Sequence, residues 1–340
     1  MPRYGLTKAR TMGAIAEAIR SAGGSSKRVF GRAGIPLTLL DTPDRLILLR
    51  DQVGLVQAAI REIGDPALPA RLSTGFGIAG LGPIGLQVRS AGTLGEALSR
   101  VEAVTPILLQ TATWTGLRRQ GAKVLYGYGI VERIEVGRQA NEILALGYLL
   151  GTVRHFLGPA WRPDHAIVTG ATLAGRSDIE RLLGAEIAFG PQAGLVFSPG
   201  LLGASNPNRY NPGDPGVGVN EPIDDDLTTC VAHLIDLGLD EKRPTLDGIA
   251  HRLGLSRRTL QRRLDEAGTR YADIQQRVMA GRAQSLLSGS LSIGRIAQDL
   301  GYADASHFTR AFLEWTGVTP SQWRRKVEPQ DSDGRLPSDR

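Results

Sequence analysis

Arginine and glutamine side chains share one face of a short helix predicted near residue 256. In the segment SRRTLQRRL (256–264), Leu260 and Leu264 lie one helical turn apart and form an apolar face. The opposite face carries Arg257, Arg258, Gln261 and Arg262. In the major groove of a duplex, an Arg side chain can donate two hydrogen bonds to guanine, and a Gln side chain can pair with adenine. These residue types at this spacing predict a helix that contacts bases.

The same pattern occurs a second time, about 47 residues later in the chain. IAHRLGLSRRTLQRR begins at residue 249, and IAQDLGYADASHFTR begins at residue 296. Each copy ends its first helix with a glycine, Gly254 or Gly301, which can adopt the left-handed conformation. A second helix then begins at Ser256 or near Asp304, where the side chain can accept from free backbone N–H groups. The sequence therefore predicts two helix-turn-helix units, the second with a turn one residue longer.

The second helix of the second copy also presents polar side chains opposite an apolar pair. Phe308 and Phe312 take the places of Leu260 and Leu264. The exposed positions are Ser306, His307, Thr309 and Arg310. A pair of helices that only packs, or that binds protein, is the structural alternative. We disfavour it because four arginines within seven positions of the first copy, 257, 258, 262 and 263, repel one another unless an anion lies between them.

An apolar helix is predicted between the two copies, over residues 271–288. Its apolar residues cover a wide arc, so we expect it to contact both units. Eighteen residues at about 1.5 Å each span roughly 27 Å. This length is of the same order as the roughly 34 Å between successive major-groove faces of a duplex. One chain could therefore read two consecutive grooves.

Nearly all of the positive charge belongs to the segment that carries the repeat. The chain of 340 residues has a net charge of +6. Residues 241–326 hold 15 Lys and Arg against 8 Asp and Glu, whereas residues 1–240 hold 23 against 22. Such a concentrated basic region is typical of a protein that binds a polyanion, although a solvated basic surface would look the same by charge alone.

The elements that position these helices fall into two predicted domains. Four prolines and four glycines lie between residues 203 and 222, a density that excludes regular structure and indicates a linker. Upstream, helical spacing alternates with strand-like segments such as 123–136, 165–171 and 185–198, which predicts an α/β domain. We predict this domain over 1–205, a linker over 206–222, an all-α domain over 223–326 and a disordered tail over 327–340.

The C-terminal residues resemble the DNA-binding domain of the AraC/XylS transcription regulators. The resemblance covers about residues 224–326 and is strongest in GYADASHFTRAF followed by GVTPSQWRR. It implies two helix-turn-helix units joined by a helix, each inserting its second helix into the major groove. On matching positions it assigns base contacts to Arg258, Gln261, Arg262, Ser306, His307 and Arg310. One departure is Leu264, where many relatives carry an aromatic residue.

The N-terminal residues are similar to the regulatory domain of the ornithine-utilisation branch of this family, which is described as arabinose-binding-like. TLGEALSRV (93–101) and LLGAEIAFGPQAGLVFSPGLLGASNPN (182–208) carry this resemblance, in a segment that is unusually rich in glycine. It implies a domain that senses a small-molecule effector or forms a homodimer. Five side chains are candidates for a pocket, although ordinary core and surface roles are favoured for them: Trp114, Arg118, Arg119, Tyr126 and Tyr128.

Other chemistry finds little support in the sequence. GFGIAG (75–80) has the spacing of a dinucleotide-binding loop, but the preceding DPALPARLST lacks a buried β-branched strand, so we expect a helix-packing segment. The five histidines are scattered without the spacing of metal ligands. Cys230, the one cysteine, lies on a predicted amphipathic helix and is expected to be a buried structural thiol. We expect no catalytic residue, cofactor or metal.

These observations lead to a sequence-specific transcription regulator of double-stranded DNA, expected to be a homodimeric activator that answers to a small-molecule effector and contacts RNA polymerase. Two alternatives are a regulator whose N-terminal domain only dimerises, and an architectural DNA binder without sequence preference. An enzyme tethered to DNA would need a nucleophile or metal constellation before residue 220, which the sequence lacks. No segment has the length and apolarity of a membrane span, so we expect a cytoplasmic, nucleoid-associated protein.

Overall fold

The computed structural model describes residues 4–210, 222–240 and 244–327. Contacts between residues divide the chain into two compact units, with the division between Cys230 and Val231. The predicted boundary lies several residues earlier, at 222/223. The first turn of the helix that crosses this division belongs to the first unit, where the buried Cys230 Sγ lies 3.8 Å from the Tyr4 carbonyl oxygen.

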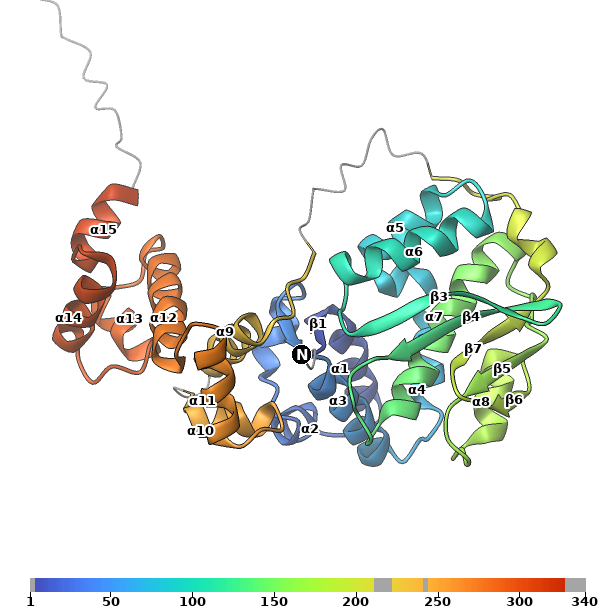
Figure 1. Cartoon of the computed structure of the whole chain (residues 1–340), viewed down its shortest axis with the longest axis horizontal. Coiled ribbons are helices and arrows are strands. Elements are labelled where there is room, and N and C mark those ends of the chain that lie inside the picture. Colours follow the sequence, from blue (N-terminus) through green and yellow to red (C-terminus); the bar gives the residue numbers. More distant parts are fainter. Residues whose placement is uncertain (1–3, 211–221, 241–243, 328–340) are drawn as a thin grey trace, which may run out of the picture. The chain divides into compact units, whose positions relative to one another are not determined.

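The first unit is built around a five-stranded sheet with helices (Figure 1). Its elements are β1 (Leu6–Lys8), α1 (Met12–Ser21), α2 (Ser26–Arg32), β2 (Leu46–Leu48), α3 (Leu49–Ile63), α4 (Leu68–Phe76), a 3-10 turn (Gly77–Leu81), α5 (Pro83–Ser90), α6 (Leu94–Leu108), β3 (Thr113–Gln120), β4 (Lys123–Ile130), α7 (Arg138–Leu157), β5 (His165–Val168), α8 (Arg176–Leu183), β6 (Ile187–Phe189) and β7 (Ala193–Phe197). The strand order is β3-β4-β7-β5-β6, and β1 pairs with β2 in a separate small sheet.

Pairing in the larger sheet is antiparallel except at one edge. β4 pairs antiparallel with both β3 and β7, β7 pairs antiparallel with β5, and β5 pairs parallel with β6. Alternation along the strands separates two faces. Tyr126 and Leu195 point into the main core with helix α7, whereas Leu125, Val196 and Ile167 form a small apolar cluster of their own.

Helix α7 packs closely against α4 because it carries a glycine at the crossing. A Cβ on Gly147 would lie 1.9 Å from Ser73 Oγ and 2.6 Å from Ser73 Cβ. The Ser73 hydroxyl donates to the Pro69 carbonyl oxygen at 2.9 Å, so it is tied to its own helix. Only a residue without a side chain fits between the two helices here.

The segments predicted as helix or strand in this unit are confirmed in type, with two corrections. The segment DRLILLRDQVGLVQAAIREIG (44–64) has helical spacing throughout, but its residues 46–48 form strand β2. The strand predicted over 123–136 ends at Ile130, because the chain turns there into the loop before α7. Strand β3 and helices α2, α4, α5 and α8 were not predicted. In β3, TWTGLRRQ mixes glycine and charged residues without clear alternation. GFGIAG lies at the end of α4 and in the following 3-10 turn, with no strand directly before it, as expected for a helix-packing segment.

The second unit is helical, as predicted. After α9 (Leu227–Gly238), which begins in the first unit, it comprises α10 (Leu246–Arg252), α11 (Arg257–Glu266), α12 (Tyr271–Leu287), α13 (Ile293–Asp299), α14 (Ala305–Thr316) and α15 (Pro320–Val327). The fold class is therefore confirmed: an α/β unit followed by an all-α unit.

The predicted linker and tail fall largely outside the described residues. Of the linker, residues 211–221 are not described, and Asn206–Tyr210 hydrogen-bonds to the end of α5 through the Arg89 and Ala91 carbonyl oxygens. Of the tail, only Val327 is described. Among the described residues, no helix combines the length and apolarity that a membrane crossing requires.

Candidate DNA-binding interface

The first helix-turn-helix unit consists of α10 and α11. Gly254 ends the first helix with a φ of 67°, in the left-handed region that the sequence analysis assigned to it. Ser256 caps α11, because its Oγ accepts from the Thr259 N–H at 3.1 Å. Leu260 and Leu264 are fully buried on the inner face of α11. The predicted turn, cap and apolar pair are all confirmed.

The outer face of α11 is exposed and strongly basic. Arg257, Arg258, Gln261 and Arg262 are all exposed. Arg257 Nη1 lies 2.9 Å from Asp247 Oδ2, and Arg262 forms an ion pair with Glu266 one turn along the helix. Both arginines keep about 60% of their side-chain surface exposed. Exposed ion pairs contribute little to stability. A phosphate or a guanine can therefore replace either carboxylate at a small cost in free energy.

The second helix-turn-helix unit consists of α13 and α14. It repeats this construction with an aromatic core. Gly301 has a φ of 77°. Asp304 Oδ1 accepts from the His307 N–H at 2.8 Å and caps α14. That backbone hydrogen bond holds the pKa of the Asp304 carboxyl below its usual range. Phe308 and Phe312 are fully buried, and their rings pack against Tyr302 and Trp323, respectively.

The outer face of α14 carries fewer charges than that of α11. Ser306, His307 and Arg310 are exposed. His307 Nδ1 lies 3.0 Å from Asp304 Oδ2, which orients the ring at the start of the helix. Thr309 is half-buried, and its hydroxyl donates to the Ala305 carbonyl oxygen at 2.7 Å. Thr309 therefore has less surface to offer a ligand than the other three.

Helix α12 contacts both units, as expected from its wide apolar arc. On one side the Tyr271 hydroxyl and the Gln275 amide donate to the Pro244 carbonyl oxygen, just before α10, at 2.8 and 3.1 Å. On the other side Met279 and Leu287 belong to the core of the second helix-turn-helix unit. Helix α12 thus joins the two helix-turn-helix units in one helical body.

Arg324, a residue without a predicted role, fastens α15 to this body. Its Nε donates to the Leu287 carbonyl oxygen at 3.2 Å, and its Nη2 donates to the Leu291 carbonyl oxygen at 2.5 Å. Both carbonyls lie at the end of α12 or beyond it, where helix carbonyls lack partners. The signal in the sequence was a basic residue next to Trp323, which does not identify such a partner.

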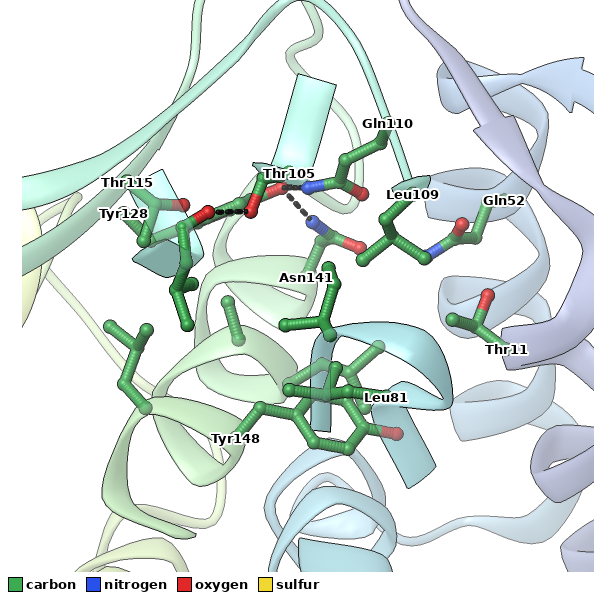
Figure 2. A pocket seen from close by; sticks show the side chains of 15 residues that line it. Thr11, Gln52, Leu81, Thr105, Leu109, Gln110, Thr115, Tyr128, Asn141 and Tyr148 are labelled. Atoms are coloured by element: carbon green, nitrogen blue, oxygen red, sulfur yellow. Dashed lines mark hydrogen bonds between the residues drawn. The ribbon is translucent and has the colours of Figure 1, made fainter. Parts of the chain in front are cut away.

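The pocket candidates of the first unit separate into two groups. Tyr128 lies in the wall of a cavity, together with residues that the sequence analysis did not single out (Figure 2). Tyr126 is fully buried in the core, and Arg118 stacks over the Trp114 ring at 4.2 Å. Sequence spacing could not find the cavity, because its wall residues come from segments more than a hundred positions apart.

Comparison with known proteins identifies both parts of the chain. Residues 23–206 match the family described as the arabinose-binding domain of AraC transcription regulator, N-term, and residues 249–326 match a helix-turn-helix domain family. The HTH-type transcriptional regulator VirS of Mycobacterium tuberculosis is 27% identical over 94% of this chain and 96% of its own length. The ornithine utilization regulator of Pseudomonas aeruginosa is 40% identical over 24% of each chain.

Among solved structures, the transcriptional regulator CdpR from Pseudomonas aeruginosa covers 93% of this chain and 98% of its own, at 19% identity and a TM-score of 0.42. The arabinose-binding family match covers more than half of the chain, and the helix-turn-helix match covers the two units described above. The chain belongs to the AraC family and is a DNA-binding transcription regulator.

Proposed function

We propose that this protein is a sequence-specific transcription activator that answers to a small-molecule effector. One observation carries the DNA-binding part: two capped helices, α11 and α14, each bury an apolar pair and expose polar side chains on the opposite face. In this proposal residues 1–205 sense the effector and dimerise, residues 206–222 link the domains, and residues 223–326 bind DNA.

Affinity and specificity come from different residues in this proposal. Phosphate neutralisation by the basic segment supplies most of the affinity and makes binding sensitive to salt. Base contacts supply the discrimination. We assign base contacts to Arg258, Gln261 and Arg262 on α11 and to Ser306, His307 and Arg310 on α14. Arg257 and Thr309 complete the contact surface at the edges of these faces.

The test compares specific with random DNA. The full-length protein selects its sites from a pool of random duplexes, and fluorescence anisotropy at fixed salt then measures Kd for a selected site and for a scrambled site of equal length. A sequence-specific regulator should prefer the selected site by a factor on the order of 10³ or more. An enriched sequence that binds no better than its scrambled counterpart would support the architectural binder instead.

The activator and homodimer parts need their own measurements. Light scattering on the full chain should give twice the 36.4 kDa of one chain. In transcription reactions with purified RNA polymerase, a promoter with a selected site upstream should give more transcript when the protein is present. A decrease in transcript would make the protein a repressor. A response that no small molecule alters would favour the alternative in which the N-terminal domain only dimerises.

A further inference from the structure

A cavity lies in the first unit where the sheet meets helices from three parts of the chain. Its wall is formed by Tyr128 of β4, Gln52 of α3, Thr105 and Val101 of α6, and one face of α7. The space open to the centre of a water-sized sphere is about 70 Å³. Since about 10–15 Å³ on this measure holds one water, the cavity has room for a small organic molecule.

A cluster of amide and phenol groups forms the polar part of this wall. Figure 2 shows the Gln110 and Asn141 amides converging on the Tyr128 hydroxyl, to which their nitrogens donate at 3.2 and 3.0 Å. Burial raises the pKa of the Tyr128 phenol to about 12, so it stays protonated at neutral pH. These bonds fix the orientation of the cluster without a ligand.

Two amide oxygens in the wall, and the hydroxyl oxygen of Thr11, have no hydrogen-bond partner within the described part of the chain. The amide oxygens are Gln52 Oε1 and Asn141 Oδ1, and both residues are 97% buried. Buried polar atoms are nearly always paired, because an unpaired one loses its bond to water and gains nothing. The two amide oxygens lie on different helices, α3 and α7, which meet at this cavity. A molecule in the cavity that donates hydrogen bonds would satisfy them.

Charge restricts the ligand further. The described lining residues include no Asp, Glu, Lys, Arg or His. The remainder of the wall is mainly aliphatic, with Leu81, Ile84, Leu144 and Leu149 among its members. An ion buried here would lose its hydration without gaining a counter-ion, which is strongly unfavourable. A polyol would place those of its hydroxyl groups that do not reach the polar side chains against aliphatic carbon.

We propose that this cavity is the effector site and that it takes a small uncharged molecule with an apolar body and at least one hydroxyl or N–H donor. The donor pairs with Gln52 Oε1, a second donor pairs with Asn141 Oδ1 where the molecule has one, and the apolar body packs against the leucines. This inference rests on the proposed effector-responsive function. It disfavours amino acids, carboxylates, amines and free pentoses as effectors.

The experiment measures thermal stabilisation of the full chain by probes of equal size and different charge. Benzyl alcohol and 4-methylphenol represent the proposed class, while benzoate, benzylamine, L-ornithine and L-arabinose represent the disfavoured ones. An uncharged probe at ten times its Kd should raise Tm of the first unit by about 3 °C, because it binds only the folded state. Titration calorimetry gives the Kd itself.

Three variants locate the binding. Ala145→Phe fills the cavity and should abolish the Tm shift, whereas Gln52→Leu keeps its size, removes one acceptor and should weaken binding at least several-fold. Thr152→Val is the matched control: Thr152 is buried on the same helix but does not line the cavity, and its hydroxyl donates to a backbone carbonyl of its own helix, that of Tyr148. If Ala145→Phe does not fold, Gln52→Leu alone decides. Equal binding of benzoate or benzylamine, an unchanged response in Gln52→Leu, or no binding of either uncharged probe would overturn the proposal.

A DNA-binding readout separates this inference from the proposed function. If the uncharged probes bind and the variants lose them, but Kd for the selected DNA site stays the same, the cavity is a ligand site and the effector-responsive function is not supported. If a metabolite changes DNA affinity equally in wild type and in Gln52→Leu, the protein is effector-responsive and the cavity is not the site.

Discussion

The two recognition helices, α11 and α14, carry arginines that differ in the ion pairs they form in the absence of DNA. Arg262 is paired with Glu266 on its own helix. Arg310 forms no hydrogen bond or ion pair with the described residues, and its charge contributes to lowering the pKa of the Asp304 carboxyl at the start of α14. A guanidinium that is already exposed and has no carboxylate to release can donate both of its bonds to one guanine. Arg310 is therefore the sharper probe of base recognition.

We expect Arg310→Ala to weaken binding to the selected site by about 1–3 kcal/mol, or roughly 5- to 150-fold in Kd, because a bidentate contact with guanine is lost. Binding to scrambled DNA should change little. Fluorescence anisotropy with both duplexes at one salt concentration measures this. Arg277→Ala is the control, since Arg277 is exposed on α12, outside both recognition helices. Equal losses on both duplexes would reassign Arg310 to a phosphate contact.

Glu142 is a buried carboxyl whose ionisation should make stability depend on pH. It is 1% exposed, and desolvation raises its pKa, although Thr169 donates to Oε2 from its hydroxyl at 2.7 Å and from its N–H at 3.2 Å. The folded state therefore holds the proton to higher pH than the unfolded state does. Stability falls as pH rises from the unfolded pKa, near 4.3, through the folded one.

The substitution Glu142→Gln should remove this dependence, because the amide oxygen can still accept both bonds from Thr169 and carries no charge. We expect the Tm of the variant relative to wild type to rise as pH increases from 4 to 8. Thermal melts across that range measure the difference. Glu135→Gln, at an exposed position, should leave the wild-type pH dependence unchanged. A constant Tm difference for Glu142→Gln at all pH values would contradict the argument.

The crossing of α4 and α7 sets the geometry of the first unit at the level of elements. Gly147 allows the two helices to approach, and α7 supplies Asn141, Leu144 and Leu149 to the cavity. An added methyl group would press on Ser73, whose hydroxyl is already bonded to its own helix. The close approach therefore fixes the position of one whole cavity wall.

We expect Gly147→Ala to destabilise the first unit by about 1–3 kcal/mol through overpacking, despite the better helix propensity of alanine. The control is Gly54→Ala in α3, where an added Cβ meets no atom within 4 Å. That change should leave stability unchanged or raise it by up to about 1 kcal/mol. Urea titration followed by circular dichroism compares the two. A stabilised Gly147→Ala would show that the helices separate easily and that the crossing is not tightly set.

The elements that local patterns specify were predictable from sequence, and those that tertiary contacts specify were not. Each helix-turn-helix unit contains a cap, an i, i+4 apolar pair and a turn glycine, and each of these features acts within a few residues. The sequence therefore predicted Ser256, Leu260 and Gly254 in their observed roles. Strand β3 lacks alternation and forms because β4 pairs with it over eight residues. The cavity depends on packing among distant helices, and the sequence indicated only Tyr128.

The whole molecule separates two physical tasks between its two compact units. The second unit carries nearly all of the net positive charge and both recognition helices, so it is the unit that binds DNA. The first unit contains the cavity with its two unpartnered amide oxygens. Each unit has a core of its own, with Tyr126 and Leu195 in one and Phe308 and Phe312 in the other. Separate cores allow the units to unfold in separate steps.

Scanning calorimetry of the full chain should therefore resolve two transitions that respond to different ligands. A ligand raises the midpoint only of the unit whose folded state it binds. The selected DNA duplex should raise the transition of the helical unit, and Gly147→Ala should lower only the other one. An uncharged probe of the cavity should restore part of what Gly147→Ala removes, since it binds the same unit. One transition, shifted alike by the duplex and by Gly147→Ala, would mean that the units unfold together and that division of the chain near Cys230 has no energetic counterpart.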